Sequence, residues 1–372
     1  MDRKELLGEV ERIVIKVGTT TITKGSSMAS KEMMDSIARQ VKELKDGGKE
    51  VLIVTSGAIG IGLNVMGVKP HPSDIPLRQA ASSVGQSILM QKWNESFQEY
   101  GLTVAQILLT MDIYSDRDSV LNLNNTVDVL LSHNIVPVFN ENDAVSIKEI
   151  DAVFGDNDTL SALVASRMDA DLLLILSDVE GLYDRNPKKY DDAKFISVVT
   201  EVTKEIEDMA GDPVTGLGVG GMKTKIKAAK ICKDAGCRMI IASSEVDNVI
   251  GKAISGEEAG TLFISDMHIG KKRRWLKTAR SYGVIMVDEG ACKAILGHRS
   301  LLPAGITEVQ GNFSRGDVVS ICHNGAVVAK GTPQYDSVEI QKIKGKHSSS
   351  IKDTLGHAMK SAVILSEDMV IL

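Results

Sequence analysis

The stretch Arg12-Ile-Val-Ile-Lys-Val-Gly-Thr19 is a short apolar run that contains one lysine and closes on a glycine. Similar apolar runs recur along the chain and alternate with longer segments of helical periodicity. The expected strands are residues 12–17, 51–55, 103–109, 135–139, 172–176 and 239–242, and the expected helices are 31–46, 77–99, 120–133, 158–169 and 222–235. Strands that are apolar throughout and separated by helices are typical of a parallel sheet covered on both faces. The sequence therefore predicts an α/β fold with a mainly parallel central sheet.

Length and composition set the broad class. The chain has 372 residues, which favours two domains over one hydrophobic core. A hydrophobic content of 43% and a charged content of 25% are those of an ordinary globular protein, and the net charge of −6 argues against a dedicated nucleic-acid binder. The four cysteines lack C-x-x-C spacing and, with seven scattered histidines, form no zinc pattern. We expect buried free thiols in a reducing compartment.

The ends and apolar runs of the chain bear on its location. Residues Met1–Glu5 are charged and are not followed by the apolar core of a signal peptide. No run approaches the ~20 apolar residues that a membrane span needs. We therefore expect a cytoplasmic protein that does not enter a membrane.

The character of the sequence changes near residue 265, where a basic, helix-capable run, Lys271–Trp275, begins a different region. Residues 282–288, 317–323, 326–331 and 337–342 are β-like, and 290–296 is a short helix. Residues 281–372 carry nine Lys/Arg and nine Asp/Glu, a net charge of zero. The predicted organisation is a first domain at 1–265, a basic linker at 266–280 and a mostly β domain at 281–372. We interpret the basic run as a solvated linker helix rather than a nucleic-acid contact.

Polar residues cluster where the expected strands end, which is where parallel sheets bind ligands. The clusters are Lys16–Thr20, Thr55–Gly62, Asn140–Asp143 and Ser177–Asp178. Lys16 supplies the positive charge that phosphoryl transfer requires, although a lysine ending a strand is often only solvated. Thr55–Gly62 combines hydroxyls with backbone amides that can hold a carboxylate or phosphate, and an ordinary strand-to-helix turn is the alternative.

A glycine-rich stretch, Gly216-Leu-Gly-Val-Gly-Gly-Met-Lys-Thr-Lys225, precedes the expected helix at 222–235. Backbone amides, a helix N-terminus and ammonium groups converge there, which is typical of a polyphosphate site. Gly216, Gly218 and Gly221 match G-x-G-x-x-G, but a dinucleotide site needs a strand before this motif, and a polar helix precedes it here. A P-loop is excluded because no Gly-Lys-Ser/Thr occurs. The alternative is a flexible loop before a surface helix with solvated lysines.

Two acidic clusters, Asn140–Asp143 and Gly155–Asp158, suggest an amino acid as the substrate. Each contains an Asn–Asp pair, and together they can receive an α-ammonium and an α-carboxylate. An aspartate between two lysines could also hold their ammonium groups in position. The alternative is that Asp156 or Asp158 merely caps a helix.

These motifs resemble a known family. The matching segments are Ile13–Thr19, Ile53–Ile59, Asn134–Val145, Gly155–Ala162, Ser177–Tyr183 and Gly216–Lys225, with Val287–Ala291, Ser300–Gly305 and Gly311–Gly316 in the C-terminal part. On them, the chain resembles the amino acid kinase family over nearly its whole length, and in particular the members that act on glutamate and carry a C-terminal PUA domain. The resemblance implies a three-layer sandwich with a mainly parallel sheet, followed by a small, mostly β PUA-like domain.

The resemblance also implies a reaction and its residues. ATP would phosphorylate the γ-carboxylate of L-glutamate, the first step toward proline, with Mg²⁺ bridging the phosphate oxygens and few protein ligands for the metal. The implied catalytic residues are Lys16, Asp158 and Lys225; the glutamate-binding residues are Ser56, Gly57, Asp143 and Asn157; and the ATP-binding residues are Lys16, Ser177, Asp178, Val219, Gly220, Gly221, Met222, Lys223, Thr224 and Lys225. The family often has threonine where this chain has Ser177 and Val219, so any contact at Val219 must use the backbone.

Partners and alternatives follow from the same resemblance. It implies a homo-oligomer (a dimer or tetramer) and feedback inhibition by proline. Because proline shares the α-amino acid end of glutamate, we expect it to act at residues 144–152, beside the glutamate site. Because an acyl phosphate hydrolyses or cyclises readily, we also expect its hand-off to glutamate-5-semialdehyde dehydrogenase. Aspartate, N-acetylglutamate or a nucleoside monophosphate are alternative acceptors, but an N-acetylated substrate has no ammonium for Asp143 to pair with. A different class of function, an accessory protein that binds RNA, is disfavoured by the zero net charge of residues 281–372. A dehydrogenase is disfavoured by the misplaced glycine motif.

Overall fold

A computed structural model describes residues 2–8, 10–24, 28–69, 74–110, 116–145, 157–187, 189–209, 221–265, 276, 279, 281–357 and 360–372. Contacts divide the chain into two units, one within residues 1–268 and the other mainly within 269–372. The domain limits expected at 265 and 281 remain predictions.

The first unit is built on an eight-stranded sheet in the order β3-β4-β2-β1-β5-β9-β10-β8. The strands are β1 Arg12–Val17, β2 Glu50–Val54, β3 Val104–Leu109, β4 Val136–Glu141, β5 Leu172–Ser177, β8 Val198–Val199, β9 Arg238–Ser243 and β10 Thr261–Phe263. Every pairing from β3 to β9 is parallel, and only β10 runs antiparallel to its neighbour β9. The mainly parallel sheet is confirmed, and the six expected strands differ from the observed ones by two residues or fewer.

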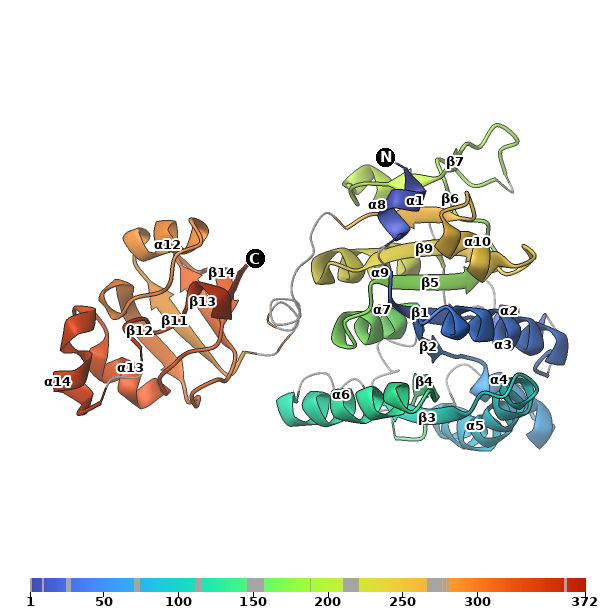
Figure 1. Ribbon diagram of the computed structural model, residues 1–372, viewed down its shortest axis with the longest axis horizontal. Coiled ribbons are helices and arrows are strands. Elements are labelled where there is room, and N and C mark those ends of the chain that lie inside the picture. The colour runs from blue at the N-terminus through green and yellow to red at the C-terminus, as the bar shows by residue number, and fades with distance from the viewer. Residues whose placement is uncertain are drawn as a thin grey trace. The chain divides into compact units, whose positions relative to one another are not determined.

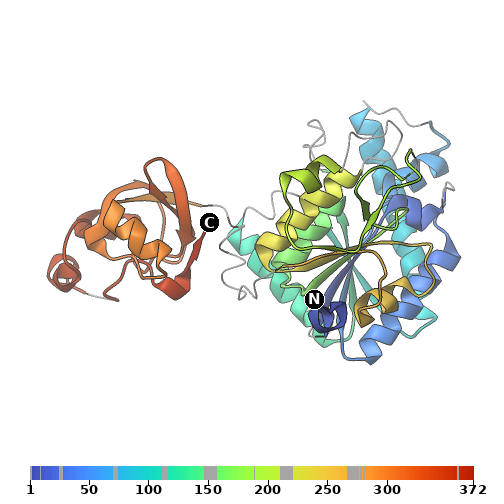
Figure 2. The ribbon, with the colours of Figure 1, turned by 90° about the horizontal axis from the view of Figure 1, so that it is seen from above.

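Helices cover both faces of this sheet (Figures 1 and 2). They are α1 Arg3–Leu7, α2 Thr19–Thr23, α3 Lys31–Asp46, α4 Ala58–Met66, α5 Ile75–Gln98, α6 Arg117–Ser132, α7 Asn157–Arg167, α8 Lys204–Met209, α9 Met222–Ala235 and α10 Val249–Ser255. Because side chains alternate along a strand, Ile13 and Ile15 of β1 pack in the core with α3, α5 and α10, while Val14 packs in the core with α6, α7 and α9. The result is the three-layer arrangement that the sequence predicts.

Local signals set the ends of two helices that were predicted to the residue. The hydroxyl of Ser30 accepts a hydrogen bond from the backbone amide of Met33 and caps α3. Gly236 takes the left-handed conformation after α9, with φ 74°, and its amide bonds the carbonyls of the last turn. α9 therefore begins and ends where its glycines place it.

Helices α4 and α5 pack with their backbones in contact. A Cβ atom added to Gly62 would lie 1.7 Å from the carbonyl oxygen of Ala81, and one added to Gly85 would lie 1.8 Å from that of Ala58. No side chain larger than hydrogen fits at either crossing point. This contact fixes the spacing between α5 and the loop that leads from β2 into α4.

The second unit contains a five-stranded sheet in the order β12-β11-β13-β14-β15. Its elements are β11 Gly283–Val287, α12 Glu289–Leu296, β12 Ile306–Gly311, β13 Val319–His323, β14 Ala326–Gly331, α13 Ser337–Ile343, α14 Ile351–Leu355 and β15 Met369–Ile371, with 3₁₀ turns at Pro303–Gly305, Ser348–Ser350 and Ser366–Asp368. In the first unit, β6 Leu182–Tyr183 and β7 Phe195–Ile196 form a separate hairpin. The expected small β-rich C-terminal module is confirmed.

One expected element of this module is wrong. Residues 337–342 were expected to be β-like, but they form helix α13. Asp336 and Glu339 make a capping box, in which each side chain accepts from the other residue's backbone amide. Ile340 and Ile343 are then buried on one face at helical spacing, a pattern that the alternation of polar and apolar residues had masked.

Two further expectations concern cysteines and membranes. All four cysteines are free and buried, as predicted. Among the described residues, no helix combines the length and hydropathy that a bilayer-spanning segment requires.

Candidate active site

The candidate site lies at the carboxyl ends of the parallel strands. β1 lies between β2 and β5 in the sheet. From β1 the chain continues to β2 on one side, and after β4 it crosses back to form β5 on the other side of β1, so the strand order reverses here. In parallel sheets, ligands bind at such a reversal of strand order. Lys16 is near the end of β1, Ser56 and Gly57 follow β2, Asp143 follows β4, Ser177 ends β5, Asn157 and Asp158 begin α7, and Gly221 precedes α9.

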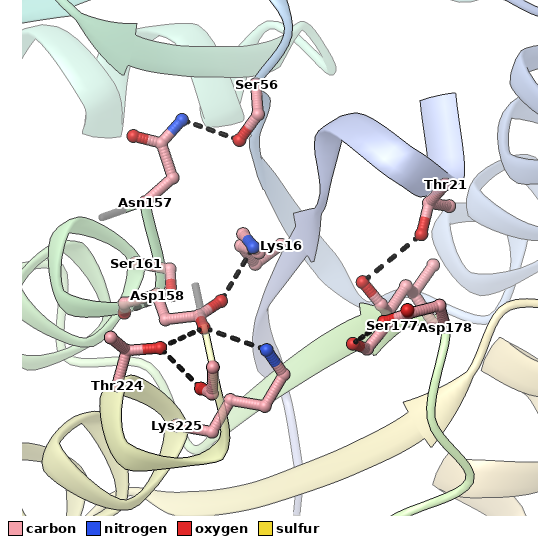
Figure 3. A network of polar contacts seen from close by, with 12 residues as sticks. Lys16, Thr21, Ser56, Asn157, Asp158, Ser161, Ser177, Asp178, Thr224 and Lys225 are labelled. Atoms are coloured by element: carbon pink, nitrogen blue, oxygen red, sulfur yellow. Dashed lines mark hydrogen bonds and ion pairs between the residues drawn. The ribbon is translucent and has the colours of Figure 1, made fainter. Parts of the chain in front are cut away.

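A buried carboxylate joins the two predicted catalytic lysines (Figure 3). The Nζ atom of Lys16 lies 2.6 Å from Oδ1 of Asp158, and the Nζ atom of Lys225 lies 3.0 Å from Oδ2. The side chains of Lys16, Asp158 and Lys225 are 9%, 0% and 6% exposed. The two ammonium groups and one carboxylate carry a net charge of +1, so this buried cluster attracts an anion.

The electrostatics of Asp158 support this arrangement. Burial by itself raises the pKa of this carboxyl, but the charges of Lys16 and Lys225 and their hydrogen bonds outweigh burial and lower the pKa to about 2. Asp158 is therefore ionised at neutral pH. The alternative that it only caps a helix does not describe it, because both oxygens are engaged by lysines.

The start of α9 adds further donors. Thr224 donates its hydroxyl hydrogen bond toward Asp158 Oδ2 at 2.9 Å and also lies 2.7 Å from the carbonyl oxygen of Gly221. Gly221 precedes the helix in extended conformation, and a Cβ atom there would meet nothing within 4 Å. The free amides of the first turn face an anion favourably. Met222 is half-buried and Lys223 is exposed, while the predicted Val219 and Gly220 lie outside the described residues.

A second group of polar residues surrounds Asn157. Its Nδ2 atom lies 2.6 Å from the carbonyl oxygen of Thr55, 2.7 Å from Oγ of Ser56 and 3.1 Å from Oδ1 of Asn140. Gly57, next to Ser56, has φ 99°, a left-handed conformation that favours glycine. The ends of β2 and β4 are thus tied to the start of α7, and Asn157 is the direct neighbour of the lysine-bound Asp158.

Helix α5 supports this group with residues that the sequence alone did not indicate. Ser82 donates to Asp143 Oδ2 at 2.7 Å, Gln86 accepts from Asn140 Nδ2 at 2.7 Å, and Trp93 Nε1 donates to the Thr55 hydroxyl at 2.9 Å. Ser82, Gln86 and Trp93 are all buried on one face of α5. The available signal was the spacing of Ser82 and Gln86, four residues apart beside the small residues Ala81 and Gly85.

The predicted nucleotide residues of β5 lie on a neighbouring strand. Ser177 is buried and donates to Oδ1 of the exposed Asp178 at 3.1 Å. Nearby, the Thr21 hydroxyl lies 3.2 Å from that of Ser244, which follows β9. Figure 3 shows Ser177 and Asp178 on the same side of the cluster as Lys225, whereas Ser56 and Asn157 lie on the other side. Lys16 and Asp158 therefore stand between the two groups of predicted binding residues.

Comparison with known families defines the class. The sequence model described as "Amino acid kinase family" matches residues 11–243, and that of the "PUA domain" matches residues 283–355. The chain therefore belongs to the amino acid kinase family, a family of phosphotransferases, and carries a C-terminal PUA domain. The carbamate kinase from Giardia lamblia bound to AMP-PNP has a similar fold, with a TM-score of 0.51, 17% identity, and coverage of 69% of this chain and 99% of that one.

Curated relatives narrow the place within the family. The chain is 52% identical to a glutamate 5-kinase of Methanosarcina barkeri, over 100% of this chain and 99% of that protein. It is 42% identical to a glutamate 5-kinase of Caldanaerobacter subterraneus, over 97% and 98%. At this identity over the full length, the chain falls in the glutamate 5-kinase branch, as its motifs predict.

Proposed function

We propose that this protein transfers the terminal phosphoryl group of ATP to the γ-carboxylate of L-glutamate, forming γ-glutamyl phosphate and ADP as the first step toward proline. The single observation that carries the proposal is the pairing of Lys16, in β1, and Lys225, at the start of α9, with one buried aspartate, Asp158, at the start of α7. The full-length identity to glutamate 5-kinases supports the choice of acceptor.

In this reaction each part of the site would have its own role. The γ-carboxylate of glutamate is ionised at neutral pH and needs no general base. Lys16 and Lys225 stabilise the negative charge on the phosphoryl group as it passes from the leaving oxygen of ADP to an oxygen of the γ-carboxylate. Asp158 holds both ammonium groups in place, and its pKa of about 2 keeps it charged while it does so. Gly221 to Lys225 bind the ATP phosphates at the start of α9, and Ser177 and Asp178 bind the nucleotide; Val219 and Gly220 remain predictions.

The acceptor site is assigned to the other side of the cluster. Ser56, Gly57 and Asn157 hold the amino acid beside Lys16, and the half-exposed carboxylate of Asp143 pairs with its α-ammonium. An N-acetylated acceptor lacks that ammonium, which favours glutamate over N-acetylglutamate.

Mg²⁺ fits this site as an ion carried by the nucleotide. Among the described residues, no group of three or more His, Cys, Asp or Glu side chains could hold a metal, and the carboxylate of Asp158 already binds two lysines. The oxygens of ATP and water would therefore hold the ion, as is common for Mg²⁺. When bound, it would neutralise phosphate charge.

We place the enzyme in the cytoplasm as a homo-oligomer that is inhibited by proline and passes its product to glutamate-5-semialdehyde dehydrogenase. The proposed proline locus, residues 144–152, lies outside the described residues apart from Ala144 and Val145. We do not assign RNA as a partner, because the PUA domain and its flanking residues carry no net charge between 281 and 372.

The test is acyl phosphate formation with Mg-ATP, trapped as hydroxamate, with glutamate, aspartate and N-acetylglutamate in parallel. We expect a signal with glutamate alone, lost in Asp143→Ala and strongly reduced in Asp143→Asn. The asparagine can still accept from Ser82, so it isolates the charge from the local fold. A signal with another acceptor overturns the substrate assignment, and no signal with any acceptor overturns the proposed reaction.

A further inference from the structure

The orientation of the Asn157 side chain is set by its surroundings. Its amide group lies 2.6 Å from the backbone carbonyl of Thr55, and because a carbonyl oxygen can only accept, the amide must present its nitrogen there. The same nitrogen faces Ser56 and Asn140. Asn157 Oδ1 has no partner among the described residues and, as Figure 3 shows, points away from Ser56. Within the part of the chain that the structure describes, Asn157 Oδ1 is therefore available as an acceptor.

The orientation of Asn140 follows from that of Asn157. Because Asn157 presents its nitrogen, Asn140 must present Oδ1 to it, at 3.1 Å. The Nδ2 atom of Asn140 is then turned toward Gln86, whose Oε1 accepts at 2.7 Å. Asn140 is 3% exposed and Gln86 is 7% exposed, so bulk water cannot take over this hydrogen bond. A directed chain of three amides thus runs from α5 to the start of α7.

Gln86 keeps its Oε1 atom turned toward Asn140, although this leaves its Nε2 atom unpaired among the described residues. With Oε1 turned to Asn140, its Nε2 atom is buried and has no hydrogen-bond partner among the described residues. Buried donors are rarely left unsatisfied, and one that is calls for an explanation. The explanation on this face of α5 is that the acceptor, not the donor, of Gln86 is needed.

We propose that Gln86 is a positioning residue that, through Asn140, fixes the amide of Asn157 so that its oxygen accepts a hydrogen bond from the α-ammonium of the amino acid. This inference rests on the proposed function and adds a determinant of specificity outside the residues that touch the substrate. Without the Gln86 acceptor, Asn140 can turn its amide over, and two NH₂ groups then oppose each other and displace Asn157. The interaction that is lost is the hydrogen bond between Asn157 Oδ1 and the α-ammonium of the substrate.

The test compares L-glutamate with glutarate, the dicarboxylate of the same length that lacks the ammonium group. In Gln86→Met, which keeps the side-chain length and removes the acceptor, we expect the KM for glutamate to rise about tenfold, the effect of one hydrogen bond. The inhibition constant of glutarate and the KM for ATP should stay within about twofold of wild type, since neither ligand uses the Asn157 oxygen. A purely structural role would weaken glutamate and glutarate alike.

Two variants complete the experiment. Gln91→Met, at an exposed glutamine of the same helix, should leave all constants unchanged. Gln86→Glu keeps an acceptor for Asn140 and should retain the wild-type ratio of glutamate to glutarate affinity, which keeps the test decisive even if Gln86→Met does not fold. If wild type phosphorylates glutamate, either of two results overturns the inference. One is a Gln86→Met variant with the wild-type ratio of glutamate to glutarate affinity, and the other is a Gln86→Glu variant in which that ratio falls. A wild type that does not use glutamate contradicts the proposed function instead.

Discussion

Lys16 and Lys225 contact different oxygens of one carboxylate, that of Asp158, and all three side chains are almost completely buried. A carboxylate buried this deeply needs a compensating charge, and here two ammonium groups supply it. These three side chains together carry a net charge of +1, and in the proposed function this charge lies between the ATP and glutamate sites.

Removing one lysine should slow the chemistry more than it weakens binding. In Lys225→Met, we expect kcat to fall by about 10²–10³-fold, the usual effect of losing one group that stabilises transition-state charge. The KM for glutamate should change little, because Lys225 lies on the nucleotide side of Asp158. Lys230→Met is the control, since Lys230 is on the same helix but pairs with Glu207 at the surface. Steady-state kinetics with both substrates varied would show the split, and a rise in KM alone would contradict the assigned role.

Thr224 should contribute through its hydrogen bond to Asp158. Thr224→Val keeps the shape of the side chain but removes the hydroxyl that lies 2.9 Å from Oδ2. The loss of one such bond to a charged group corresponds to about 2 kcal/mol, or roughly 30-fold in kcat/KM for ATP. Thr224→Ser keeps the hydroxyl and should stay near wild type. Equal activities of the valine and serine variants would show that the hydroxyl plays no part.

The depressed pKa of Asp158 predicts a component of acid instability. Its pKa is about 2 in the folded protein and ~3.9 in an unfolded chain. The unfolded state therefore binds the proton more readily than the folded state does. The contribution of ionised Asp158 to the free energy of unfolding is fully present above pH ~4 and is lost as the pH falls toward 2. The contribution is roughly 2 kcal/mol. Urea unfolding should show that, between pH 5 and 2.5, the free energy of unfolding falls less in Asp158→Asn than in wild type.

The exposed Asp234→Asn on α9 is the matched control for that titration. It should lose stability on acidification as wild type does. A variant at Asp158 that follows the wild-type pH profile would show that other carboxylates cause the acid instability.

The contact between α4 and α5 should tolerate no added methyl group. Gly62→Ala places a Cβ atom 1.7 Å from the Ala81 carbonyl oxygen, so the helices must separate. We expect a loss of at least about 2 kcal/mol of stability, and a raised KM for glutamate because Ser56 and the α5 contacts shift apart. Gly60→Ala, in the same helix with nothing within 4 Å of the new atom, should be neutral or stabilising by up to ~1 kcal/mol. Calorimetry on the two variants gives the comparison, and similar melting temperatures would refute the packing argument.

The positions of several candidate site residues in the fold were predictable because strand ends carry strong local signals. Lys16 and Ser177 end buried apolar runs, and such runs are found by composition alone. Glycines and caps marked the ends of α3 and α9 to the residue. The roles of these residues came from resemblance to a family, since strand positions alone left several acceptors open.

What escaped prediction depends on contacts between distant segments. Gln86 and Ser82 are ordinary helical residues in sequence, and only the packing of α5 against the β4 end gives them partners. Strands β8 and β10 are two and three residues long, too short for a periodic signal. For residues 337–342, the alternating pattern of Val338 and Ile340 competed with the capping box at Asp336 and Glu339, and the cap prevailed.

The pairing of Lys16, Asp158 and Lys225 also bears on how the protein is made. These residues lie in β1, α7 and α9, so a ribosome-bound chain that ends before Met222 contains the carboxylate but only one of its two cations. β9, which follows α9, completes the parallel part of the sheet beside β5. Because contacts between distant segments form later than local ones, we expect the charged cluster and the pairing of β5 with β9 to form only after this last part of the domain has been synthesised.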